Sequence, residues 1–196
     1  MGNVSDELAA GLGRALLSNE EAEAIDAHGQ TEAAVLVPLY EDEKGAGLVF
    51  TERRSDLRRH AGEISFPGGR RDHPSEELER TALREAEEEI GLDPTSVEVV
   101  GALPPIGTFV TSYKVHPFVG LIPAGTTLAP NPTEVAAILH LSIDTLRDAY
   151  EMRRLVRRGV PFKTPTYEVE RHLIWGATAR ILEMFLERFD EAVGSA

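Results

Sequence analysis

The sequence predicts an α/β (α+β) fold with a mixed central sheet, on three observations. Apolar runs typical of strands are interspersed with segments whose apolar residues recur at helical spacing. Several strand-like runs follow one another too closely for a helical crossover, so some neighbouring strands must be antiparallel. The 196 residues suit a single domain, 1–196, and 42% hydrophobic content is enough to build a core.

The first elements are one helix and three strands. Apolar residues at helical spacing predict a helix over 5–17. Strands are expected at 33–40 and 46–53, joined by a polar hairpin turn, and alternation predicts a short strand at 64–66 that stops at Pro-Gly-Gly.

A second helix is expected to begin at Ser75, a typical N-cap residue, and to run to Ile90. Its first turn would hold Glu76 and Glu77, where the helix dipole favours acids. Gly91 is suited to end it, because glycine adopts the left-handed conformation found after helices.

The rest of the chain continues the interleaved pattern of strands and helices. The remaining elements expected are strands at 97–103, 115–122, 135–141 and 167–175, and helices at 142–158 and 177–189.

Composition excludes several classes of protein. The net charge of −13 argues against a nucleic-acid binder, which needs a basic face. There is no apolar run long enough to span a membrane and no secretory signal pattern, so we expect a cytoplasmic protein without a membrane partner. The absence of cysteine excludes disulfides and thiolate chemistry. A homodimer is left open.

The stretch 53–92 segregates its charges. Between positions 53 and 71 there are six arginines and two acids, whereas 72–93 holds nine acids and two arginines. An arginine cluster therefore precedes the densest carboxylate cluster of an acidic protein.

Three of those acids share one helix face. At about 100° per residue, Glu85, Glu88 and Glu89 lie within an arc of about 100°, while Glu87 lies opposite. Their mutual repulsion is most simply offset by a hard cation such as Mg2+. A solvated acidic face is the plain alternative, but the acids follow Arg84, and a Phe-Pro-Gly-Gly segment, whose backbone can approach a ligand closely, lies upstream.

This segment resembles the Nudix box, whose consensus is G, five residues, E, seven residues, then REUxEExGU with U aliphatic. Residues 84–92 read REAEEEIGL and match throughout, within a box at about 69–92. With Glu76 as the consensus glutamate, Gly69 lies one position early, so the loop is one residue longer. The resemblance implies a Nudix-type α/β/α sandwich with a mixed central sheet.

The longer loop is usual in the coenzyme A pyrophosphatase-like branch of the Nudix hydrolases. The second signature of that branch, LLTxR[SA]x3[RK]x3Gx3FPGG, is similar to residues 49–69 with every spacing kept. The departures are Val49 and Phe50 in place of two leucines and Arg54 in place of a small residue.

The resemblance implies that Glu85 and Glu89 bind Mg2+ or Mn2+, that Glu88 shares in binding it, and that the Gly69 carbonyl adds a ligand. The catalytic group would comprise Glu88 and Glu85, with Arg84 orienting the glutamates. Which carboxylate is the general base stays open.

The candidates for binding a polyanionic nucleotide substrate are Arg53, Arg58 and His60, because arginine forks match phosphate oxygens. His60 has an alternative role as a packed loop residue. We expect Glu134 to be structural or at the surface rather than catalytic, and Phe109 and Trp175 to be core residues rather than adenine-stacking ones.

Three functions remain open. The first is cleavage of CoA or acyl-CoA to 3′,5′-ADP and (acyl) 4′-phosphopantetheine. The second is a Nudix pyrophosphatase for ADP-ribose, NADH or a nucleoside triphosphate. The third is a nucleotide-sensing Nudix domain without catalysis, which the three retained glutamates disfavour.

Overall fold

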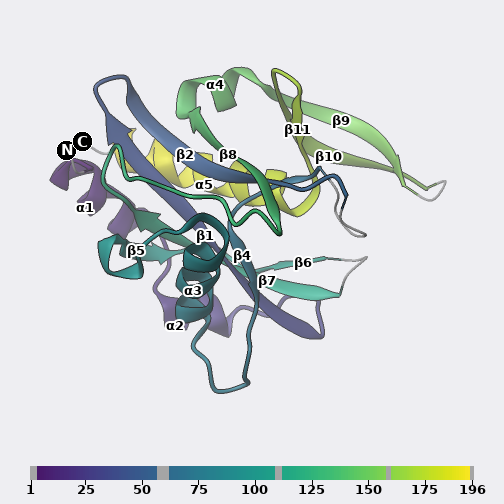
Figure 1. Ribbon diagram of the computed structural model, residues 1–196, viewed down its shortest axis with the longest axis horizontal. Helices are drawn as coiled ribbons and strands as arrows, with labels where there is room; N and C mark the ends of the chain where they lie inside the picture. The colour runs from purple at the N-terminus through teal and green to yellow at the C-terminus, as the bar shows by residue number, and fades with distance from the viewer. Residues whose placement is uncertain (1–3, 57–61, 109–111, 158–159, 195–196) are drawn as a thin grey trace.

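Three layers make up the molecule, with a central sheet between two layers of helices (Figure 1). The computed structural model describes residues 4–56, 62–108, 112–157 and 160–194. The helices are α1 (Asp6–Ala15), α2 (Asn19–Ala24), α3 (Leu78–Ile90), α4 (Ile143–Asp148) and α5 (Gly176–Gly194), with a 3-10 turn, η1, at Pro94–Ser96.

The strands form two sheets. The larger sheet contains β1 (Thr31–Asp42), β2 (Gly45–Arg53), β3 (Ile64–Ser65), β4 (Gly68–Arg70), β5 (Glu98–Ala102), β6 (Ile106–Gly107), β7 (Tyr113–Leu121) and β8 (Val135–Ser142). The smaller sheet contains β9 (Tyr150–Arg157), β10 (Val160–Val169) and β11 (His172–Ile174).

The larger sheet is mixed, as the sequence predicts. Its main path runs β3-β2-β1-β7-β5, and β1 and β7 are parallel whereas the other pairs are antiparallel. β2 pairs with β1 only near the hairpin turn and then continues beside β8 and β3. The other end of β1 pairs with β4. The strand predicted at 64–66 does stop before Pro-Gly-Gly, and the two glycines then begin β4, which was not predicted.

Each face of the sheet has its own hydrophobic core. On one face the buried residues come from α1 and α5 together with strands such as β2 and β7, and α1 packs against α5. On the other face α3 buries Ala82, Ala86 and Ile90 against Leu36 and Phe118 of the sheet. This packing confirms the three-layer arrangement and fixes which side of α3 faces the strands.

Two expected helices need correction. The helix predicted over 142–158 ends at Asp148, and 150–157 forms strand β9, because each of its residues pairs with one of β10 in a long hairpin. The helix α3 begins at Leu78 with Glu77 as N-cap, not at Ser75. The Glu76 carboxylate instead accepts a hydrogen bond from the backbone N–H of Asp72 at 2.8 Å, and Glu76 stays outside the helix.

The two terminal helices agree with expectation. The first spans Asp6–Ala15 within the predicted 5–17, and the last spans Gly176–Gly194 around the predicted 177–189. The short elements α2, β4 and β6 were not predicted, since each has too few residues to show a period. No helix in the described ranges has the length and apolar character needed to span a bilayer.

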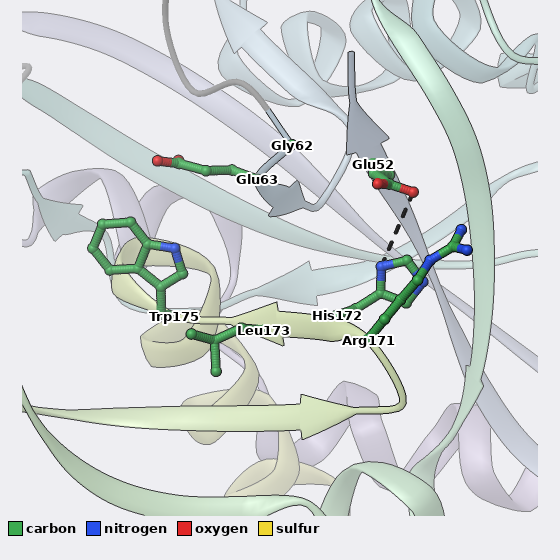
Figure 2. Close-up of a pocket in the computed structure, with 7 residues that line it drawn as sticks. All are labelled: Glu52, Gly62, Glu63, Arg171, His172, Leu173 and Trp175. Atoms are coloured by element: carbon green, nitrogen blue, oxygen red, sulfur yellow. Dashed lines mark ion pairs between the residues drawn. The ribbon is translucent and has the colours of Figure 1, made fainter. Parts of the chain in front are cut away.

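A pocket of about 430 Å3 lies between β11 and the segment of β2 and β3 that carries Glu52 and Glu63 (Figure 2). It corrects one expectation, because Trp175 is only partly buried and lies on the pocket wall rather than in the core. Phe109, the other aromatic residue expected in the core, lies outside the described residues. The pocket is lined by Glu52, Gly62, Glu63, Arg171, His172, Leu173 and Trp175.

His116 on β7 gives the fold a predicted pH dependence. The residue is 2% exposed, and neither ring nitrogen has a hydrogen-bond partner among the described residues. Burial lowers the pKa of His116 from 6.5 to about 4. Between these two pH values the residue is therefore mostly protonated in the unfolded chain and mostly neutral in the folded chain. Stability should therefore fall as the pH drops from 6.5 towards 4, by roughly 2–3 kcal/mol.

Urea unfolding across this pH range measures the effect. The variant His116→Leu should lose this part of the pH dependence, whereas the control His73→Leu, at an exposed position, should keep it. Equal slopes for wild-type protein and His116→Leu would contradict the prediction.

Candidate active site

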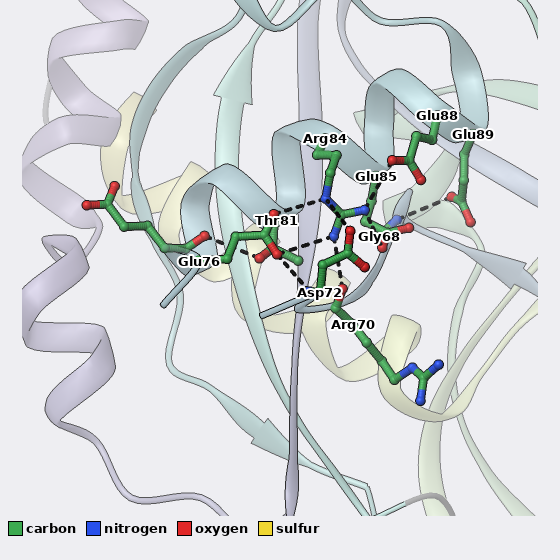
Figure 3. Close-up of polar contacts among 10 residues, drawn as sticks. Gly68, Arg70, Asp72, Glu76, Thr81, Arg84, Glu85, Glu88 and Glu89 are labelled. Atoms are coloured by element: carbon green, nitrogen blue, oxygen red, sulfur yellow. Dashed lines mark hydrogen bonds and ion pairs between the residues drawn. The ribbon is translucent and has the colours of Figure 1, made fainter. Parts of the chain in front are cut away.

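The carboxylates of α3 face strand β4 because the apolar stripe of the helix is anchored to the sheet beside them. Gly91 ends the helix with φ +65°, a conformation that favours glycine, and its N–H donates to the Glu87 carbonyl at 2.9 Å. The helix therefore has a fixed length and a fixed rotation. Its acidic face lies over Gly68 and Gly69 (Figure 3).

Arg84 contacts three carboxylates, those of Glu76, Glu85 and Glu88 (Figure 3). These three residues and Glu89 form the carboxylate cluster. The Nε atom of Arg84 donates to Glu76 at 2.9 Å, and one terminal nitrogen donates to Glu85 at 3.0 Å and to Glu88 at 3.3 Å. The other terminal nitrogen donates to the Arg70 carbonyl at 3.0 Å. This planar guanidinium group connects the loop before α3 to the helix and contacts two of the helix's glutamates.

The two glycines of β4 lie against Glu89 and Glu85. The N–H of Gly68 donates to Glu89 at 3.2 Å. A Cβ atom added at Gly69 would overlap the Glu85 carboxylate, so a larger residue there would require the end of that side chain to move away from the strand. Backbone and carboxylate oxygens thus lie close together at this point.

Burial makes this cluster electrostatically unusual. The pKa of Glu89 is raised to about 7, mainly by desolvation and also by the nearby charges of Glu85 and Glu134, while the hydrogen bond from Gly68 and the charge of Arg53 act in the opposite direction. Burial also raises the pKa of Glu85. The hydrogen bond from Arg84 has the opposite effect on Glu76, whose pKa is lowered to about 2.

The donor set suits a hard divalent cation in kind. It consists of carboxylate oxygens beside a glycine strand, and oxygen donors are what Mg2+ and Mn2+ prefer. In the described part of the chain, however, no three such side chains are already gathered around one point. Glu85 and Glu88 accept hydrogen bonds from the positively charged side chain of Arg84. Glu89 instead has a raised pKa and accepts a hydrogen bond from the backbone N–H of Gly68.

The substrate candidates are only partly described. Arg53 of β2 contacts Glu134 at 3.5 Å, and both charges act on Glu89, which places this pair beside the carboxylate cluster. Arg58 and His60 lie outside the described residues. Arg54, the departure from the upstream signature, is turned to Asp56 at 2.7 Å and to the Pro132 carbonyl.

Two residues that were not among the predicted site residues also belong to this neighbourhood. Glu134 is half-exposed, as expected for a surface residue, but its pairing with Arg53 puts its charge near Glu89. Its loop is fixed to α3, because the Asn131 N–H donates to the Glu89 carbonyl at 2.8 Å. Glu76 is the main partner of Arg84, which the spacing of the box consensus could have indicated.

Comparison with known proteins identifies the family. A NUDIX domain profile matches residues 30–159. The Nudix hydrolase NudL of Pectobacterium atrosepticum is 38% identical over 160 residues, covering 79% of this chain and 81% of the relative. The corresponding protein of Photorhabdus laumondii is 39% identical over 158 residues, covering 80% and 83%.

Solved structures agree on the fold. The Nudix hydrolase RenU of M. smegmatis aligns with a TM-score of 0.52 at 20% identity, covering 63% of this chain and 76% of that one. The NUDIX domain of Shewanella oneidensis NrtR, solved with ADP ribose, aligns with a TM-score of 0.52 at 13% identity, covering 87% and 92%. From the profile match and the curated relatives together, the chain belongs to the Nudix hydrolase family.

Proposed function

We propose that the protein hydrolyses the pyrophosphate bond of a nucleoside diphosphate derivative, with CoA or acyl-CoA as the substrate. The products would be 3′,5′-ADP and (acyl) 4′-phosphopantetheine. The observation that carries the proposal is the acid-rich, partly buried face of α3, which lies against the glycines of β4 with an arginine beside it. Buried carboxylates that lack a full set of counter-charges favour a divalent cation and its phosphate ligands.

In this proposal Mg2+ or Mn2+ is held by Glu85, Glu89 and Glu88, with the Gly69 carbonyl as a further ligand. The bound cation would polarise the phosphoryl oxygens and acidify the attacking water. Arg84 acts as a positioning residue, since it holds Glu85 and Glu88 from one side through a single guanidinium group. The proton of the attacking water passes to a carboxylate of this cluster, and the candidates are Glu85 and Glu88, of which Glu88 is the more exposed.

Arg53 is the proposed phosphate-binding group of β2. Its side chain is 34% exposed and lies close to Glu134. Its guanidinium group can therefore donate hydrogen bonds to a phosphate at the edge of the carboxylate cluster. The further proposed substrate residues are Arg58 and His60. The upstream signature around these residues supports CoA, which carries a pyrophosphate and a separate 3′-phosphate.

The CoA proposal predicts that the enzyme recognises the 3′-phosphate. With Mg2+ or Mn2+ present, kcat/KM for CoA should exceed that for dephospho-CoA by about tenfold or more, because a hydrogen bond to a charged group contributes roughly 1.5–3 kcal/mol. A panel of CoA, dephospho-CoA, ADP-ribose and NADH, with reactions lacking metal as the control, measures this.

Each alternative has its own signature in that panel. Equal turnover of CoA and dephospho-CoA would contradict CoA as the substrate. Preferred turnover of ADP-ribose or NADH would identify a Nudix pyrophosphatase of the second kind. Binding of nucleotides without turnover of any compound would identify a sensing domain.

A further inference from the structure

The hairpin of β9 and β10 projects from the side of the molecule (Figure 1). The strand order of its sheet is β11-β10-β9, so β9 is an edge strand, and within the described ranges no strand pairs with its outer side. The register of β9 with β10 is continuous from Tyr150 to Arg157, without a bulge. Both prolines of the hairpin, Pro161 and Pro165, are in β10. Strand β9 therefore has neither a bulge nor a proline to prevent a further strand from pairing with it.

Pro165 shows which backbone groups of β9 face outward. It lies opposite Met152 and has no N–H group, so this position suits a pair that exchanges no hydrogen bonds. The residues one position out of phase are the bonded ones, since the N–H of Glu168 donates to the Ala149 carbonyl at 3.3 Å. The even-numbered residues of β9 therefore direct their N–H and C=O groups to the open edge.

The same even-numbered residues have exposed and mostly apolar side chains. Five large hydrophobic side chains are exposed in the described ranges, and three of them are on β9: Tyr150 at 45%, Met152 at 48% and Val156 at 69%. Alternate residues of a strand point to one face, so these three share a face with Arg154. An open edge with an apolar face is a surface that another strand can cover.

Arg154 lies next to a like charge. The residue opposite it on β10 is Lys163. Both side chains are exposed, and neither has an ion pair or hydrogen bond in the part of the chain that the structure describes. Like charges that lie opposite each other destabilise a strand pair. Arg154 and Lys163 therefore favour a partner that carries negative charge.

Acidic side chains lie at the other end of this face, beside Tyr150. The Tyr150 hydroxyl donates to Glu183 of α5 at 3.0 Å. This hydrogen bond chiefly, and the charge of Glu187 to a smaller extent, raise the pKa of Tyr150, so both carboxylates lie near it. Neither glutamate has an ion pair among the described residues. Because one end of the face is acidic and the other basic, the face is complementary to a copy of itself related by a two-fold axis.

The charges select one register for two antiparallel β9 strands. With Met152 on the two-fold axis, Tyr150 lies opposite Arg154 of the second copy. Glu151 lies opposite Arg153 of the second copy in the same register. The registers centred on Glu151, Arg153 and Arg154 each place a charged residue opposite its own copy, which is destabilising. The register centred on Met152 also pairs even-numbered residues with even-numbered ones, so the outward backbone groups meet as an antiparallel ladder requires.

We propose that two copies of this chain associate through β9, so that their smaller sheets join into one continuous sheet across a two-fold axis at Met152. Arg154 of each copy then lies against the Tyr150 ring of the other, beside Glu183 and Glu187. The exposed apolar side chains of both edges become covered. The inference concerns assembly and goes beyond the proposed function, on which it does not depend.

Sedimentation velocity over roughly 1–100 μM, the range expected for a small and partly polar interface, tests the proposal. The wild-type protein should form a reversible dimer, which added NaCl should weaken. Arg154→Glu should raise the Kd of the dimer by about tenfold or more, because the new charge would meet Glu183 and Glu187. The matched control Arg80→Glu makes the same change at an exposed position on α3 and should leave the Kd unchanged.

Two further variants separate the interface from an effect on folding. Glu187→Arg combined with Arg154→Glu exchanges the two charges and should recover most of the lost association, which a folding defect would not allow. Met152→Pro removes an N–H group that faces outward and is not bonded to β10, so the hairpin should persist while the Kd rises by about tenfold or more.

The outcomes are distinct. A wild-type protein that stays monomeric over the whole concentration range would overturn the inference. A dimer whose Kd is unchanged by both Arg154→Glu and Met152→Pro would also overturn it, because its interface would lie elsewhere. Loss of the dimer in Arg154→Glu together with its recovery in the charge-exchanged variant would support pairing through β9.

Discussion

The variant Glu89→Gln is expected to lose hydrolytic activity by at least about 100-fold while the fold stays intact. The proposal makes this carboxylate a metal ligand, and the electrostatic help that a bound cation gives to phosphoryl chemistry amounts to several kcal/mol. Gln keeps the size of the side chain and can still accept the hydrogen bond from Gly68. The measurement is kcat with Mg2+ or Mn2+ on the best substrate of the panel.

The same substitution should stabilise the metal-free protein. Burial raises the pKa of Glu89 from 4.5 to about 7, so the unfolded chain releases a proton more readily than the folded chain. Stability of the wild type therefore falls as the pH rises from 4.5 to 7, by up to about 3 kcal/mol, and Gln removes that penalty. Above neutral pH, Glu89→Gln should unfold at higher urea concentration than the wild type, and Mg2+ should narrow or reverse the difference.

The matched control is Glu87→Gln. This residue has the same charge and lies on the exposed side of the same helix, so both its activity and its stability should stay close to wild type. A Glu89→Gln enzyme with unchanged kcat would contradict the metal site proposed here. A loss of activity that accompanied a loss of stability would indicate a structural role for Glu89 instead.

The central part of the fold could be predicted because its signals are local. The strands at β1, β2 and β7 and the helices α1 and α5 each have an apolar pattern of sufficient length. The helix predicted over 142–158 was wrong because the pairing of β9 with β10 is set by tertiary contacts, which periodicity within one segment does not contain. The split of β2 from β1, which makes room for β3 and β4, depends on the same kind of contact.

The site shows the same division between local and long-range information. Helical geometry alone places Glu85, Glu88 and Glu89 on one face, and the structure sets that face against β4. The pairing of Arg53 with Glu134 joins positions 81 residues apart and was not predicted. The position of Trp175 on a pocket wall was missed because an aromatic residue at the end of an apolar strand is more often part of the core.

The variant Arg84→Ala is expected to lower the free energy of unfolding at neutral pH by roughly 3 kcal/mol, since breaking a buried ion pair from one side leaves its partner charges uncompensated. Glu76 and Glu85 are 11% and 18% exposed and both bind this guanidinium, so they would lose their counter-charge together. Activity should fall as well, because Glu85 and Glu88 would no longer be held in place.

The sign of the pH dependence distinguishes this network from ordinary surface charge. The pKa of Glu76 is lowered from 4.5 to about 2, so its contribution to stability is fully present above 4.5 and disappears as the pH falls towards 2. The difference in unfolding free energy between the wild type and Arg84→Ala should therefore shrink on acidification. Arg80→Ala removes the same charge from an exposed position on α3 and should alter stability by less than about 0.5 kcal/mol at any pH. If Arg84→Ala and Arg80→Ala lowered the free energy of unfolding equally, the guanidinium group of Arg84 would not hold the cluster together. Arg84→Lys keeps the positive charge but not the planar group, so a loss of stability between those of the wild type and Arg84→Ala would separate the two contributions.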